Sequence, residues 1–356
     1  MSRETNMVLK ANLDILKLVN DENKTLAEEF IEYLEATDKT PSTIKVYKSN
    51  LNIINCYLYE RCKNKPFVEI SKRDILNLQK FMLRAGLSSA RIKNVRATIS
   101  SLSNYIEAML DDEYPNFRNV VGKIPPPPAN RVRQHTVLDM DEIQELLDVL
   151  TNKGRHQVAC YVAMCAYSGA RKSETILYQD AWFNDKAVIN GLYKTPLIRT
   201  KGRGSAGKQL NKYVIRNKVD FYLENWRKQR EELGVNIDDL FVTKELDDKR
   251  RWTGKWLPAQ VSTANSFIET CNNIMDLKDE NGEDKELNLY SHSLRHFYAT
   301  YLAKANIPTE VIADIIGHGS VEMTKLYIDI DSEDSFMKYF SDEGIVEVER
   351  GDLKNI

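Results

Sequence analysis

Apolar residues recur at intervals of three or four through the first 110 residues, which is the spacing of amphipathic helices. The stretch TLAEEFIEYL, from Thr25, places Leu26, Phe30 and Leu34 four residues apart. A later stretch, SSARIKNVRATISSLSNYIEAML, places its apolar residues on one face at Ile92, Val95, Ile99, Leu102 and Ile106. The N-terminal part of the chain is therefore predicted to be helical.

Residues typical of helix ends divide this region into separate helices. Thr40 followed by Pro41 is typical of a helix start, because proline fits the first turn. Ser71 is an N-cap residue, and Gly86 is expected to end the helix that Ser71 opens. We expect four or five helices and no strand up to residue 110.

Four consecutive prolines, Pro125 to Pro128, interrupt the helical pattern and favour an extended, stiff linker. At 356 residues the chain suits two domains, each with its own core. The predicted organisation is an N-terminal extension (1–24), a helical domain (25–118), a linker (119–135), a second domain (136–340) and an acidic tail (341–356).

The second domain is also predicted to be mainly helical. Helical patterns cover 139–152 and 156–178, and the latter contains an apolar helix that should end near Gly169. Strand character is confined to 187–215, whose glycine-rich centre suggests a loose hairpin tip. The remainder is expected to be helical apart from a polar insertion at 276–287. The fold class is mainly α with a small β-hairpin.

The distribution of charged residues along the chain adds information about possible partners. The net charge is only -2, yet 39–110 carries a local balance of about +9 and 329–352 one of about -7. A basic stretch of this size suits a polyanion, although a solvated helix surface explains it equally well. The five cysteines form no CxxC pair and suggest reduced thiols in a cytoplasmic protein. No apolar run reaches the length of a membrane span.

The candidate chemistry lies in HSLRHFYATYLAKANIPTEVIADIIGHGSVEMTKLY, from His292 to Tyr327. His292 and His296 stand at i and i+4, as zinc ligands on a helix would, and His318 could be a third ligand. However, Arg295 brings a positive charge into the same turn, which suits an anion better than a dication. We therefore favour an anion site over a metal site.

Further cationic positions lie upstream of this window. SGARKSE places Arg171 just after Gly169, and RTKGRG places Lys201 on the predicted hairpin. The order of these motifs resembles that of the tyrosine recombinases, or phage-type integrases. The order is an arginine in S-G-x-R-x-S-E, a lysine on a hairpin, H-x-L-R-H, G-H, and a tyrosine nine residues after that histidine. The resemblance covers about residues 25–340.

This resemblance implies a role for each matching residue. Tyr327 would be the nucleophile that forms a 3′-phosphotyrosine with DNA, and Arg171 and Arg295 would grip the phosphate. His292 would handle the tyrosine's proton, and Lys201 would protonate the departing 5′ oxygen. The remaining matches are His318 as a phosphate donor, Glu174 as support for the site and His296 as a residue that orders the helix; Arg203 and Lys208 are rivals of Lys201.

The resemblance also implies partners. The helical domain would clamp double-stranded DNA at specific recombination sites, and the C-terminal segment would join subunits into a tetramer on DNA. No metal, ATP or other cofactor would be needed, and the protein would associate with the nucleoid. A DNA-binding regulator that does not recombine and a relaxing topoisomerase are the alternatives. The expected DNA contacts are Lys45, Lys48, Arg91, Lys93, Arg96 and Arg203.

Overall fold

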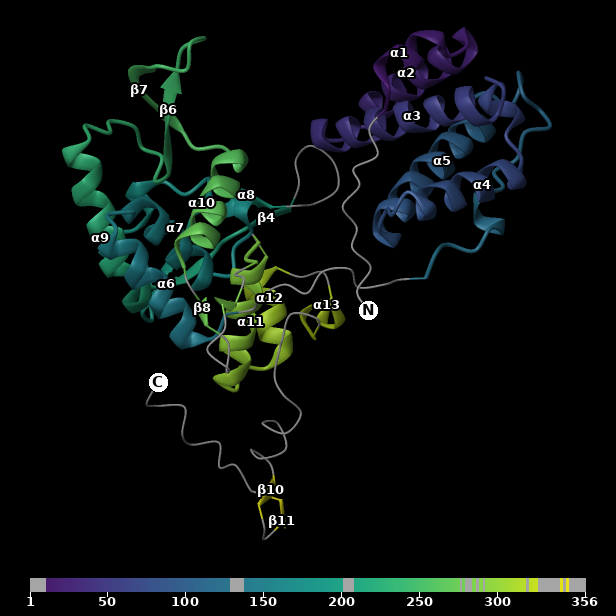
Figure 1. Cartoon of the computed structure of the whole chain (residues 1–356). Helices are drawn as coiled ribbons and strands as arrows, with labels where there is room; N and C mark the ends of the chain where they lie inside the picture. Colours follow the sequence, from purple (N-terminus) through teal and green to yellow (C-terminus); the bar gives the residue numbers. More distant parts are fainter. Residues whose placement is uncertain are drawn as a thin grey trace. The chain divides into compact units, whose positions relative to one another are not determined.

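The computed structural model describes residues 11–128, 138–200, 208–275, 277–278, 284–285, 288–290, 292–317, 320–325, 340–341 and 344–345. The chain forms two compact units that meet in sequence between Gln134 and His135. We call the first the helical unit and the second, because it holds the candidate active-site residues Arg171 and Arg295, the catalytic unit; each is described by itself (Figure 1). None of the described helices is long and apolar enough to cross a membrane.

Within residues 11–128, the helical unit contains five α-helices and one apolar core (Figure 1). The helices begin as their end signals predict: Thr40 caps the helix that starts at Pro41, and Ser71 forms a capping box with Asp74. Gly86 follows the helix with φ of 79°, a conformation that favours glycine. The helices are α1 (Leu13–Leu18), α2 (Asp21–Ala36), α3 (Pro41–Arg61), α4 (Lys72–Arg84) and α5 (Ser89–Met109), with 3₁₀ turns at Phe67–Glu69 and Val121–Lys123.

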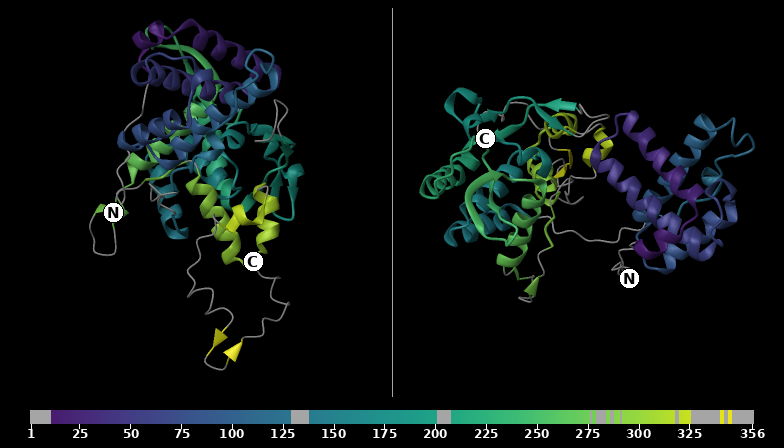
Figure 2. Two further views of the ribbon diagram at one scale, coloured as in Figure 1. Left: turned by 90° about the vertical axis from the view of Figure 1, so that its right-hand side faces the viewer. Right: turned by 90° about the horizontal axis from the view of Figure 1, so that it is seen from above.

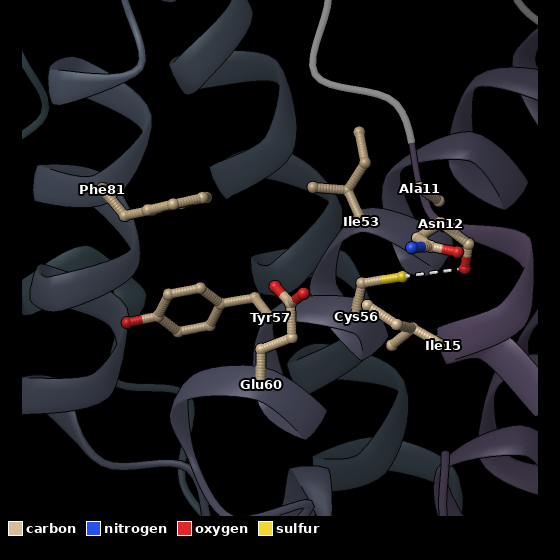
Figure 3. A pocket seen from close by; sticks show the side chains of 8 residues that line it. All are labelled: Ala11, Asn12, Ile15, Ile53, Cys56, Tyr57, Glu60 and Phe81. Atoms are coloured by element: carbon tan, nitrogen blue, oxygen red, sulfur yellow. Dashed lines mark hydrogen bonds between the residues drawn. The ribbon is translucent and has the colours of Figure 1, made fainter. Parts of the chain in front are cut away.

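The N-terminal boundary differs from the expected one. Asn20 caps α2, so this helix begins four residues before Thr25, and α1 lies within the segment expected to be an extension. A cavity of about 90 Å³ lies beside α1, between Asn12 and Phe81 (Figure 3). Its one thiol, Cys56, donates a hydrogen bond to the Asn12 carbonyl, and burial raises the pKa of that thiol. The cavity therefore offers no activated nucleophile.

The catalytic unit is built around α7, whose side chains are buried from Val158 to Ala166. An apolar helix of this kind needs neighbours on all sides, and α6, α9, α10 and α11 pack against it. The helices are α6 (Met140–Asn152), α7 (His156–Ala166), α8 (Lys172–Thr175), α9 (Arg216–Glu232), α10 (Val261–Ile274), α11 (Ser293–Lys304), α12 (Thr309–Ile316) and α13 (Val321–Lys325). In Figure 2 the last three, in yellow-green, form one group.

Small antiparallel sheets complete the catalytic unit. The region predicted to have strands, 187–215, forms a three-stranded sheet, β1-β2-β5, and a hairpin, β3-β4. These strands are β1 (Val188–Ile189), β2 (Leu192–Lys194), β3 (Ile198–Thr200), β4 (Lys208–Leu210) and β5 (Tyr213–Ile215). Two short pairs, β8 (Leu277–Lys278) with β9 (Asp284–Lys285) and β10 (Phe340–Ser341) with β11 (Gly344–Ile345), lie near the C-terminal end of the sequence.

One hairpin contradicts the expectation that the rest of the chain is helical. Strands β6 (Val242–Leu246) and β7 (Trp252–Pro258) pair directly (Figure 1). Most of the residues of β7 are exposed, so the hairpin has no continuous apolar face toward the core. The Lys244 ammonium lies 4.8 Å from the centre of the Trp252 ring, a cation–π contact. Contacts between a charged and an aromatic side chain on neighbouring strands stabilise a two-stranded hairpin. They do not produce the alternation of apolar and polar residues by which a half-buried strand is recognised in a sequence.

Candidate active site

Arg295 connects three segments that are far apart in the sequence. It lies in the first turn of α11, and its side chain is 1% exposed. Its Nη1 donates to the Gly169 carbonyl at 2.7 Å, and its Nη2 donates to the Ile316 carbonyl at 2.7 Å. Short hydrogen bonds from a charged donor are strong and directional. Arg295 therefore ties the turn before α8 to the end of α12.

Two glycines make these contacts possible. Gly169 has φ of 59°, and a Cβ there would overlap the Tyr298 ring. Gly317 has φ of 74° and ends α12, and a Cβ there would meet the Leu210 side chain. Only glycine occupies such a backbone conformation at so close an approach without strain. The glycines of S-G-A-R and I-G-H thus set the positions of the carbonyls that hold Arg295.

Arg171 and Glu174 form a reciprocal pair at the start of α8. The Arg171 amide donates to Glu174 Oε2 at 2.9 Å, and its Nη1 donates to Glu174 Oε1 at 2.8 Å. The Glu174 side chain is 1% exposed, whereas that of Arg171 is 20% exposed. Burial alone would raise the pKa of Glu174, but Lys212 and the hydrogen bonds from Arg171 outweigh it and lower this pKa. Glu174 is therefore an ionised carboxylate that orients Arg171.

His292 lies directly before α11, near both arginines. Burial, followed by the charges of Arg295 and Arg171, lowers the pKa of His292 from 6.5 to about 4. The imidazole is consequently neutral at pH 7 and can accept a proton. The Tyr290 ring lies 6.0 Å from the His292 ring and 6.5 Å from the His296 ring. His296 thus lies beside Tyr290.

Lys212, which was not among the predicted site residues, lies next to Glu174 in the structure. Lys212 lies between β4 and β5, its side chain is fully buried, and its Nζ is 3.0 Å from Glu174 Oε2. The signal was a lysine within LNKYVI, where its neighbours Tyr213 and Val214 predict a strand. A charged residue in such a short apolar run has to find a partner, because an unpaired buried charge is very costly.

Four predicted functional residues, Lys201, Arg203, His318 and Tyr327, lie outside the described residues. Among the described residues that precede them in the sequence, β3 ends at Thr200 and packs against α8, and α12 ends at Ile316 before Gly317. Within the described ranges, no three His, Cys, Asp or Glu side chains come together in a way that could hold a metal ion.

The basic residues of the helical unit differ in their surroundings. Lys45, Lys48 and Lys93 are exposed, and Lys48 pairs loosely with Glu35 at 3.7 Å. Arg91 is partly buried, and its Nη1 donates to the Asn50 side chain at 2.6 Å. These four residues stay candidates for phosphate contacts.

Arg96 corrects our prediction of a DNA contact. Its side chain is 7% exposed, and its guanidinium donates to Gln79 Oε1 at 2.7 Å and to the carbonyls of Val121 and Ile124 at 3.1 and 2.6 Å. A guanidinium used in this way inside the protein has no surface to offer a phosphate. Arg96 instead fastens α5 to α4 and to the turn at 121–124.

The sequence matches a protein-family model over more than half of its length. Residues 136–334, more than half of the chain, match the model described as "Phage integrase family". This match spans Arg171, Arg295 and the three segments that Arg295 joins.

Curated relatives agree with this match. The chain is 26% identical over 241 residues to the SPbeta prophage-derived recombinase-like protein YomM of Bacillus subtilis, covering 67% of this chain and 70% of that protein. It is 24% identical over 307 residues to the tyrosine recombinase XerA of Pyrococcus horikoshii, covering 86% of this chain and 89% of that protein.

Solved structures share the fold. The XerH recombinase bound to difH before cleavage matches with a TM-score of 0.58 and 18% identity, covering 95% of this chain and 99% of that one. A lambda integrase tetramer bound to a Holliday junction matches with a TM-score of 0.59 and 15% identity, covering 90% of this chain and 82% of that one. The chain belongs to the phage integrase family and is a tyrosine-type site-specific recombinase.

Proposed function

We propose that this chain cleaves and rejoins duplex DNA at specific sites, with Tyr327 as the nucleophile. The observation that supports this most directly is the pair of hydrogen bonds by which Arg295 joins Gly169 and Ile316. Those bonds bring the S-G-A-R turn, the H-S-L-R-H helix and the I-G-H turn to one place. A cationic centre assembled from three separate motifs suits a phosphodiester, whose oxygens match the arginine fork.

In the proposed reaction the Tyr327 oxygen attacks a DNA phosphorus atom, and the bond from phosphorus to the 5′ oxygen breaks. Neutral His292 takes the tyrosine's proton, and Lys201 gives a proton to the departing 5′ oxygen. Arg171 and Arg295 stabilise the charge that develops on the other phosphate oxygens. The product is a 3′-phosphotyrosine, and attack by a 5′ hydroxyl reverses each step, so rejoining consumes no ATP.

His318 would add a hydrogen bond to the same phosphate, as its place in the G-H motif implies. Glu174 supports the site without touching DNA, because its oxygens are taken by Arg171 and Lys212. The charges of the arginines and lysines replace a metal ion in neutralising the phosphate. Integration or excision of a mobile element and resolution of replicons are the reactions that this chemistry serves.

The helical unit would bind the DNA backbone through Lys45, Lys48, Arg91 and Lys93, and Arg203, which follows β3 in the sequence, would add a further contact. Phosphate contacts of this kind position a protein without reading sequence. We also propose that the C-terminal segment joins neighbouring subunits, giving a tetramer on DNA. The DNA-bound XerH and the lambda integrase tetramer on a Holliday junction are consistent with both proposals.

The test is covalent capture on duplexes taken from the DNA that flanks the gene, nicked so that the cleaved fragment diffuses away. We expect an adduct that survives SDS and is absent with Tyr327→Phe, although that variant still binds the duplex. Tyr301→Phe is the matched control, because it removes a hydroxyl from α11 and should leave the adduct intact. Tight binding without any adduct would contradict the proposal and favour a DNA-binding regulator.

A further inference from the structure

Lys212 is a buried cation for which the proposed reaction has no use. Its side chain is fully buried, and its backbone is fixed by Thr195 on the neighbouring strand connection. The Lys212 amide donates to Thr195 Oγ1 at 2.9 Å, and the Thr195 amide donates to the Lys212 carbonyl at 2.9 Å. The side chain therefore starts from a rigid point in the sheet.

From that point the ammonium reaches a hydrogen-bond acceptor of each catalytic arginine. Its Nζ lies 3.0 Å from Glu174 Oε2, and Glu174 holds Arg171. It also lies 3.5 Å from the Ile316 carbonyl, which accepts the Nη2 hydrogen bond of Arg295. Lys212 thus contacts one acceptor of each arginine, Glu174 for Arg171 and the Ile316 carbonyl for Arg295.

Electrostatics explain why a cation is needed there. Glu174 is 1% exposed. Without Lys212, the full negative charge of this buried carboxylate would pair with Arg171 alone and would neutralise the Arg171 guanidinium. Lys212 shares the negative charge of Glu174, so that less of the Arg171 charge is neutralised. Burial lowers the pKa of Lys212, while Glu174 opposes this shift. The two buried groups therefore stabilise each other in their charged forms.

Two other roles fit the position less well. A general acid has to reach the departing oxygen, whereas the Lys212 ammonium is fully buried against a carboxylate. A contribution to stability alone is also a weak explanation, because a buried ion pair is often no more stabilising than apolar residues of similar volume.

We propose that Lys212 is a positioning residue of the recombinase site: acting through Glu174 and the Ile316 carbonyl, it holds Arg171 and Arg295 in place for the phosphate. This inference rests on the proposed function, since it assumes that these arginines bind the scissile phosphate. It predicts that Lys212 affects the cleavage step and not the affinity for DNA.

The experiment is a double-mutant cycle with Lys212→Met, Glu174→Gln and the combined variant, measuring single-turnover adduct formation on a nicked duplex at saturating protein. Lys212→Met should slow adduct formation about 10- to 100-fold and leave the Kd for DNA unchanged. The same range is found when a residue that orients a metal ligand is removed from an enzyme. In the Glu174→Gln background the same substitution should cost much less, because the carboxylate that Lys212 balances is gone. An equal loss in both backgrounds would overturn the proposal.

A second substrate separates positioning from proton donation. A duplex with sulfur in place of the bridging 5′ oxygen has a leaving group that needs no proton. Lys201→Ala should recover on this duplex, whereas Lys212→Met should stay slow. Recovery of Lys212→Met would assign it as the acid and overturn the inference.

Failure of this inference and failure of the proposed function give different results. If the unchanged protein forms no adduct, the proposed function is wrong. If it does, and Lys212→Met cleaves at the unchanged rate, only the role of Lys212 is wrong. Thermal unfolding of each variant, with Arg96→Met as a destabilised control from the helical unit, separates slow cleavage from partial unfolding.

Discussion

The two units each contain a buried arginine bonded to backbone carbonyls, and the two arginines differ in their surroundings. Arg96 in the helical unit and Arg295 in the catalytic unit are 7% and 1% exposed. Each donates to two main-chain oxygens from segments distant in sequence. The described partners of Arg96 are neutral oxygens, whereas Arg295 lies in a group with Arg171, Lys212 and Glu174.

The difference lies in charge and not in burial. Arg96 is one cation whose desolvation is offset by amide dipoles, so its site is complete without a ligand. Around Arg295 the charges of Arg171 and Lys212 come together, and the Glu174 carboxylate pairs with both of these cations. Several cations gathered in one place repel one another, and a bound anion would relieve that repulsion. A buried arginine is therefore evidence for an anion site only when its neighbours leave the local charge unbalanced.

The largest expected effect is a difference between the Arg295 and Arg96 variants in the rate of adduct formation. Arg295→Met should slow adduct formation about 10²- to 10³-fold, the usual cost of removing one preorganised donor from a transition state. Arg96→Met should leave the rate per folded molecule unchanged. Single-turnover capture on the nicked duplex measures both. A comparable loss of rate in the two variants would remove the distinction between the two sites.

Stability should not distinguish them. Both substitutions orphan buried carbonyl oxygens, and each should lower the free energy of unfolding by about 1–3 kcal/mol. Urea denaturation of the two variants, followed by circular dichroism, provides the comparison. If Arg96→Met had no effect on stability, its hydrogen bonds to Val121 and Ile124 would not be fastening α5.

Salt dependence should separate Arg96 from the exposed lysines of its own unit. Lys93→Gln removes one phosphate contact, so the slope of log K against log salt should fall by about 1. Arg96→Met should not change that slope, because its guanidinium is turned inward. Binding titrations between low and moderate salt measure the slopes. An unchanged slope for Lys93→Gln would argue against α5 as part of the DNA-binding face.

The smallest effect concerns His292. Its pKa of about 4 lies below the 6.5 of an exposed histidine, so the unfolded chain binds a proton that the folded chain does not between these values. His292 therefore contributes stability that is complete above pH 6.5 and is lost as the pH falls toward 4. Its NMR titration should have a midpoint near 4.

Arg295→Met should raise that midpoint, because it removes a positive charge that opposes protonation of His292. Arg96→Met should leave the midpoint where it is. A His292 midpoint near 6.5 in the unchanged protein would show that burial and the two arginines do not act on it as described.

Most of the helices could be predicted because their signals are local. Thr40, Ser71 and Gly86 act within a few residues of themselves, so their effect can be read along the chain. The β6–β7 hairpin could not be predicted, because its pairs, such as Lys244 with Trp256, form across strands that are mostly exposed. No local periodicity marks such a ribbon.

The sequence by itself determined the mainly helical class and, through its motifs, the family. These depend on residue type and short spacing, which need no knowledge of distant contacts. Only the tertiary structure decided that Arg96 is turned inward and that Lys212 joins the site. The reason is physical: whether a buried cation is balanced depends on oxygens from remote segments, such as Ile124 for Arg96 and Glu174 for Lys212, and folding alone brings these together.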